Sequence, residues 1–166
     1  MDRRIWIIFL TVFIDLLGFG ILIPILPTFA QNELAMNETL IGLTVGIFSL
    51  MQFIFNPLWG RLSDIYGRKP ILIFGLGGNV ISYIFTGLVL GGVLKFIPLL
   101  LFSRALAGFF SANIGAAMAY ISDVTPPKDR SKGMGLIGAA FGLGFVFGPF
   151  IGGIMAKRFG YDFPTY

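Results

Sequence analysis

Apolar residues are gathered along the chain in five long blocks, which short polar stretches separate. The blocks run from Ile5 to Leu26, Leu40 to Trp59, Ile71 to Leu94, Phe96 to Ile121 and Gly133 to Ala156. A helix needs roughly 20 apolar residues to cross the hydrocarbon core of a bilayer, and every block is long enough. Only Asp15 and Arg104 carry charge inside a block. The pattern predicts five transmembrane helices, because a helix of a soluble protein would keep a polar face.

The amino-acid composition excludes several other classes of protein. Of the 166 residues, 56% are hydrophobic and 12% are charged, against about 25% charged residues in a soluble domain. A nucleic-acid partner is not expected despite the net charge of +4. Because the chain has no cysteine and no histidine, we expect no metal and no cofactor. We expect no enzyme either, since an intramembrane enzyme would have only Asp and Ser to draw on.

Basic residues between the blocks predict the orientation in the membrane. Eight lie on the side of the amino terminus, namely Arg3, Arg4, Arg61, Arg68, Lys69, Lys128, Arg130 and Lys132, and three lie opposite, namely Lys95, Lys157 and Arg158. Positive charge favours the cytoplasmic side. We therefore expect a multi-pass protein of the plasma membrane, the inner membrane in a bacterium, with a cytoplasmic amino terminus. Anionic lipid headgroups are expected to attract the same loops.

Asp15 lies halfway along the first block. An acid at the centre of a bilayer costs about 2.5–3.5 kcal/mol on insertion scales, so it should face the helix bundle or a water-filled cavity. Two interpretations stay open. Asp15 is either a proton carrier or a fixed hydrogen-bond partner that only positions its helix.

Arg104 begins a helical face in the fourth block, where small residues follow it at intervals of three or four positions. These residues are Gly108, Ser111, Gly115 and Ala119. Such a face lets another helix approach closely. Because arginine keeps its charge, Arg104 must pair with an acid, carbonyl groups or water.

The segment GRLSDIYGRKP after the second block turns the chain back within a few residues. Gly60 and Gly67 allow close backbone approach or positive φ, and Asp64 is suited to accept from free amides at a helix start. Arg68 and Lys69 are expected to hold the loop at the headgroups.

The fifth block is rich in glycine, and each glycine inside a helix costs about 1 kcal/mol relative to alanine. Its motif residues are Gly135, Gly144, Gly148, Pro149, Gly152 and Gly153. Three of the glycines follow one another at four-residue intervals, which predicts close packing against another helix. The proline removes a backbone hydrogen bond and predicts a kink.

Polar residues at helical spacing give the second and third blocks a polar face. The candidates for lining a substrate cavity are Gln52, Asn56, Asn79 and Ser82 from these blocks, and Asn113 from the fourth. Hydrogen bonds between helices explain such residues equally well.

The turn segment and the glycine-proline pattern resemble the major facilitator superfamily, in particular its drug/proton antiporter branch of tetracycline and multidrug efflux proteins. The resemblance implies an all-α membrane protein, with five of the six helices of an amino-terminal half built from two inverted three-helix repeats. Residues 1–166 would then form an incomplete amino-terminal domain, without the sixth helix and the carboxyl-terminal half. The distance in sequence from Asp15 to Arg104 is nearly the same as that from Pro57 to Pro149. Two repeats of three helices each would give such a constant distance.

The resemblance also implies roles for particular residues. Asp123 would join Asp64 and Arg68 in a charge network at the cytoplasmic ends of the helices. Arg104 would take part in proton transfer, with structural anchoring as the alternative. Ile65 replaces an arginine of the family pattern, and Ser82 replaces the aspartate of tetracycline exporters, which argues against a metal–tetracycline substrate.

The expected function is proton-coupled export of a small drug-like molecule, with the substrate, protons, the lipid bilayer and the missing half of the transporter as partners. Two alternatives stay open: a symporter or another carrier of sugars or metabolites, or a truncated membrane protein that does not transport.

Overall fold

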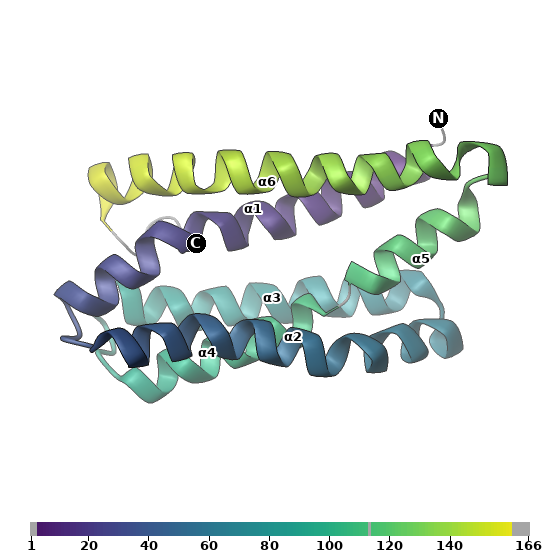
Figure 1. Ribbon diagram of the computed structural model, residues 1–166. Coiled ribbons are helices and arrows are strands. Elements are labelled where there is room, and N and C mark those ends of the chain that lie inside the picture. Colours follow the sequence, from purple (N-terminus) through teal and green to yellow (C-terminus); the bar gives the residue numbers. More distant parts are fainter. Residues whose placement is uncertain (1–2, 113, 161–166) are drawn as a thin grey trace.

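The computed structural model describes residues 3–112 and 114–160, and all regular elements in these ranges are helices (Figure 1). The elements are α1 (Arg3–Asn32), α2 (Glu38–Tyr66), α3 (Arg68–Leu90), α4 (Ile97–Ser111), α5 (Ile114–Val124), the 3-10 turn η1 (Pro127–Asp129) and α6 (Arg130–Phe159). Five spans in the described ranges are long and apolar enough to cross a membrane, and α4 and α5 share the fourth of them. The prediction of five transmembrane helices is confirmed.

The ends of the helices differ from those predicted, most of all in the first three. The second helix ends at Tyr66 instead of Trp59. The first helix continues past Leu26 to Asn32, with Pro24 and Pro27 inside it. The third helix ends at Leu90 instead of Leu94. It stops there because Gly92 has a φ of 71°, in the left-handed region that ends helices, and the Gly92 amide turns back to the carbonyl of Val89 at 3.1 Å.

The fourth span is not the single helix predicted over Phe96–Ile121. The helix α4 ends at Ser111, and α5 begins at Ile114. Between them Ala112 has a φ of −66° and a ψ of 1°, so the backbone leaves helical geometry at this point. As a consequence α5 slopes away from α4 and reaches toward the start of α6 (Figure 1).

The helices α1 and α6 pack backbone against backbone. A Cβ atom on Gly148 would lie 2.6 Å from the Cα of Gly20, and one on Gly152 would lie 2.5 Å from the carbonyl oxygen of Ile21. Gly144 meets α1 one turn earlier, at the Cβ of Leu16. The predicted glycine face is therefore confirmed at these three positions.

Other motif residues of α6 do not take part in this contact. A Cβ atom on Gly135 or Gly153 would meet no atom within 4 Å, so these two glycines do not make the close contact that the other three make. They lie on helix faces turned away from α1. Pro149 lies inside α6 without ending it.

The helices α2, α3 and α4 form a second group in which α4 packs against both of the others. Gly108 of α4 lies so close to the backbone of Phe48 that no side chain would fit there. The Trp59 indole N–H donates to the carbonyl of Phe109 across 2.7 Å and joins α2 to α4. The first helix of each predicted repeat thus packs on the second helix of the other, α1 on α6 and α4 on α2, as inverted repeats require.

Candidate functional site

Asp15 of α1 accepts a hydrogen bond from the side-chain amide of Asn79 of α3, with 2.5 Å between nitrogen and oxygen. The same amide nitrogen lies 3.0 Å from the hydroxyl oxygen of Ser111, at the end of α4. Asn79 and Ser111 are buried, whereas Asp15 is partly accessible. Three helices that are distant in sequence therefore meet at one acid halfway along the bundle.

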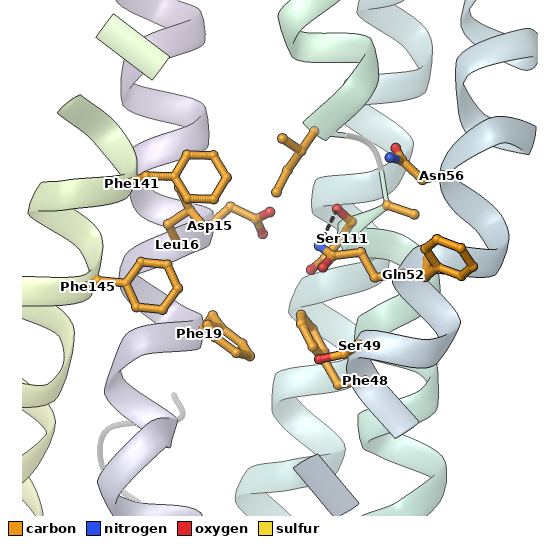
Figure 2. A pocket seen from close by; sticks show the side chains of 13 residues that line it. Asp15, Leu16, Phe19, Phe48, Ser49, Gln52, Asn56, Ser111, Phe141 and Phe145 are labelled. Atoms are coloured by element: carbon orange, nitrogen blue, oxygen red, sulfur yellow. Dashed lines mark hydrogen bonds between the residues drawn. The ribbon is translucent and has the colours of Figure 1, made fainter. Parts of the chain in front are cut away.

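A cavity of about 500 Å³ opens beside Asp15, between the α1–α6 pair and the α2–α4 pair (Figure 2). Its polar side chains are those of Asp15, Ser49, Gln52, Asn56 and Ser111, and its aromatic side chains are those of Phe19, Phe48, Phe53, Phe141 and Phe145. Gln52 is held in place because its amide donates to the carbonyl of Ser111 across 3.2 Å. The site offers an apolar wall together with a few fixed polar groups, which is typical of small-molecule sites.

The cavity candidates from the sequence divide into four groups. Gln52 and Asn56 line the cavity. Asn79 lies behind its wall and holds Asp15. Ser82 is buried and donates to the carbonyl of Gly78 in its own helix, so its prediction as a lining residue is wrong. Asn113 lies outside the described residues.

Sequence reasoning missed the contribution of α6 to the cavity. Phe141 and Phe145 lie four positions apart and face Asp15 from the opposite side to Gln52 (Figure 2). Their spacing, which puts both on one helix face, was a signal that could have found them. The sequence pattern places Ser111 only on the face of small residues that follows Arg104.

Arg104 does not pair with Asp15. Within the described ranges no carboxylate lies within 4.0 Å of the guanidinium. Arg104 is buried and donates instead to the hydroxyl of Thr86 across 2.6 Å. Its Cζ atom lies 5.8 Å from the centre of the Tyr83 ring, a distance typical of a cation–π contact. The hydroxyl of Tyr83 in turn lies against α1 at Gly18.

Arg68 joins two acids at the end of the bundle where α2, α3 and α5 meet. Its Nη1 atom lies 2.5 Å from Asp64 of α2, and its Nε atom donates to Asp123 of α5 across 3.1 Å. The hydroxyl of Ser63 also accepts from Arg68. The structure thus brings together the three residues of the expected network, and adds a fourth.

The turn between α2 and α3 is tighter than expected, since Gly67 alone separates the two helices. Gly67 has a φ of 94°, which a residue with a side chain adopts only with strain. Gly60 lies inside α2 and its Cβ would meet nothing, so the expected close approach there is wrong. Asp64 lies in the last turn of α2, so it does not cap a helix start. Lys69 is exposed at the beginning of α3.

Comparison with known proteins agrees with this architecture. The family model described as the Major Facilitator Superfamily matches residues 8–166. The chain belongs to this superfamily, whose members are transporters, and is a multi-pass membrane protein. The resemblance inferred from the sequence is confirmed.

Similar proteins include two efflux proteins. The chain is 37% identical over 157 residues to the tetracycline resistance protein, class H, of Pasteurella multocida, covering 93% of this chain and 38% of the relative. It is 37% identical over 153 residues to multidrug resistance protein 1 of Bacillus subtilis, covering 91% of this chain and 38% of the relative. The chain therefore spans about two fifths of the length of these relatives.

A solved structure is also similar. The crystal structure of the human organic anion transporter MFSD10 (TETRAN) matches with a TM-score of 0.79 and 27% identity, over 99% of this chain and 45% of that one. The fold is thus that of an amino-terminal half of a major facilitator transporter, as predicted.

Proposed function

We propose that this chain forms the first five helices of a proton-coupled antiporter that exports a drug-like small molecule. The membrane would be the plasma membrane, the inner membrane in a bacterium, with the amino terminus in the cytoplasm. The observation that carries the proposal is the position of Asp15. It is the one acid in the five apolar blocks of the sequence, and it lies on the wall of a cavity large enough for a ligand. The names of the tetracycline and multidrug resistance relatives support the substrate class.

Asp15 would carry the coupled proton. The Asn79 amide donates to its carboxylate, and the cavity beside it has room for water and for part of a substrate. A substrate group that donates a hydrogen bond to the Asp15 carboxylate would compete there with the proton. Substrate entry and proton release would thereby be linked at one site.

Arg104 would act in this mechanism as a fixed positive charge, and not as an ion-pair partner of Asp15. The Tyr83 ring lies under the Arg104 guanidinium, and its hydroxyl lies against Gly18 of α1. A movement of α1 would therefore shift the Tyr83 ring and change its contact with Arg104.

The network of Asp64, Arg68 and Asp123 would hold the cytoplasmic ends of α2, α3 and α5 together in one state of the transport cycle. Its ion pairs lie at the surface, where each contributes little alone. A contact made of several weak ion pairs suits a gate, because a gate must open in every transport cycle.

The rest of the transporter would supply the second wall of the cavity beside Asp15.

Transport can be tested in a chimera. This chain would be joined to the part of the class H tetracycline resistance protein that lies beyond the matched region, and reconstituted in liposomes with an acidic lumen. We expect ethidium to drive proton release from the lumen, reported by a trapped pH dye. Substrate movement that is the same with and without the proton gradient would contradict proton coupling.

A further inference from the structure

A groove of about 420 Å³ lies between α1 and α3, near the end of the bundle where both helices begin (Figure 1). Its apolar lining includes Ile7 of α1 and Leu72, Ile73 and Leu76 of α3. Ile7 and Ile73 are 55% and 60% exposed, so the groove is open from outside the bundle. Its volume is within the roughly 300–1,000 Å³ of small-molecule sites.

The two helices fix the depth of the groove. They are joined by the hydrogen bond from Asn79 to Asp15, about one helical turn further into the bundle than the lining residue Leu76. From Lys69 in the first turn of α3 to Leu76, the helix rises about 10 Å. One leaflet contributes about 15 Å to the hydrocarbon core. With Lys69 at the headgroups, the groove would therefore face the acyl chains of one leaflet.

Three polar side chains also line the groove, namely those of Lys69, Thr11 of α1 and Tyr120 of α5. Lys69 is exposed, and among the described residues no carboxylate lies within 4.0 Å of its ammonium group. Its neighbour Arg68 differs, because it already pairs with two acids. An exposed cation that has no counter-charge in this part of the chain thus lies at the outer end of an apolar groove.

We propose that this groove binds one anionic phospholipid of the phosphatidylglycerol class, with the phosphate at Lys69 and an acyl chain along Ile73 and Leu76. The ammonium group donates to the phosphate oxygens in charge-assisted hydrogen bonds. The hydroxyls of Thr11 and Tyr120 are suited to donate to the ester oxygens of the lipid. The cation at the outer end and the apolar walls are thus complementary to the two parts of one lipid molecule.

Lipid binding in this groove goes beyond the proposed function, because it needs neither a substrate nor a proton gradient. It rests on the proposed orientation only for the source of the lipid, since the cytoplasmic leaflet is the anionic one. The competing occupant of the groove is a helix from another part of a longer protein. Such a helix would exclude the lipid from the complete transporter.

The test is native mass spectrometry of the 166-residue chain, released from neutral detergent micelles that contain dioleoyl phosphatidylglycerol or dioleoyl phosphatidylcholine. The two lipids share their acyl chains, so a difference in binding reports the charge of the headgroup. We expect one phosphatidylglycerol to be retained about fivefold more tightly than phosphatidylcholine, the effect of one cation at an anionic surface. Soluble glycerol 3-phosphate, which has the phosphate without acyl chains, should not displace the lipid.

Two pairs of variants assign the binding to the groove. Lys69→Gln should abolish the preference for phosphatidylglycerol. Its matched control, Lys128→Gln, removes an exposed lysine of η1 that does not line the groove, and should keep the preference. Ile73→Trp fills the groove without changing its charge, and should weaken the retention of both lipids by about fivefold or more. Its matched control is Ile81→Trp, at an exposed position of α3 outside the groove.

Equal retention of the two lipids by the parent chain would overturn the inference. So would a preference that Lys69→Gln keeps, retention that Ile73→Trp leaves intact, or displacement of the lipid by glycerol 3-phosphate.

The same measurement on the chimeric transporter tests the competing occupant, and loss of the preference there would also overturn the inference. Proton-coupled export by a chimera that shows no lipid preference would leave the proposed function standing. Lipid preference without proton coupling would overturn only the proposed function.

Discussion

The side-chain amide of Asn79 on α3 donates to the carboxylate of Asp15 on α1 across 2.5 Å, at the wall of the cavity. The bond joins the α1–α6 pair to the group of α2, α3 and α4. Asn79 is buried and also contacts Ser111, so its position is fixed from two sides. Asn79 therefore sets the place of Asp15 in the cavity, although it does not itself line the cavity.

Replacing Asn79 by leucine should destabilise the chain by about 1–3 kcal/mol, because a buried hydroxyl and a partly buried carboxylate lose their donor. The free energy of unfolding in mixed micelles measures the effect. The matched control is Asn32→Leu at the exposed end of α1, for which we expect a change within about 0.5 kcal/mol. Equal stability of Asn79→Leu and the parent would show that the bond contributes nothing.

Removal of both Arg68 and Asp123 should cost less stability than the sum of the two single changes. Their side chains are 20% and 57% exposed, so we expect a coupling energy of about 0.2–1 kcal/mol that weakens in high salt. A double-mutant cycle of Arg68→Gln and Asp123→Asn measures it. The ion pair of Lys132 with Asp129 is the control, being local to one turn. Strict additivity for Arg68 and Asp123 would argue against the network.

Gly148→Ala and Gly153→Ala should have opposite effects on stability. The new methyl group on Gly148 would meet Gly20 at 2.6 Å, which forces α1 and α6 apart. The methyl group on Gly153 meets nothing within 4 Å, so alanine should stabilise α6 by about 0.5–1 kcal/mol. Thermal unfolding of the two variants side by side is the measurement. A stabilised Gly148→Ala would contradict the close packing of α1 on α6.

Single cysteines report the orientation, since the chain has none of its own. Ser131, exposed at the start of α6, should be cytoplasmic, and Val93, exposed between α3 and α4, should be external. An impermeant maleimide added to intact cells should therefore label Val93→Cys and spare Ser131→Cys. The reverse pattern would show that the bias in basic residues was misread.

The helices and their glycine contacts could be predicted from the sequence because both depend on local patterns. Long apolar blocks define the spans, and Gly144, Gly148 and Gly152 repeat at the period of one helix face. The break at Ala112 could not be predicted, since no proline or charge marks it. It depends on how α4 and α5 pack against different helices.

The partners of the buried polar residues could not be predicted from the sequence either. As the two charges inside the apolar blocks, Asp15 and Arg104 could be expected to pair, yet Asp15 contacts Asn79 and Arg104 contacts Thr86. Which side chains meet depends on the rotation of each helix about its axis. Small tertiary contacts set that rotation, and a hydrophobic pattern does not encode it.

The central claim is that Asp15 carries the coupled proton, and Asp15→Asn in the chimeric transporter tests it most directly. Asparagine keeps the size and can still hydrogen-bond with Asn79, but it does not titrate. We expect uphill export driven by a proton gradient to be lost, while exchange of substrate down its own gradient continues. Uphill export at the parental rate by Asp15→Asn would contradict the claim and place the coupled proton at another residue.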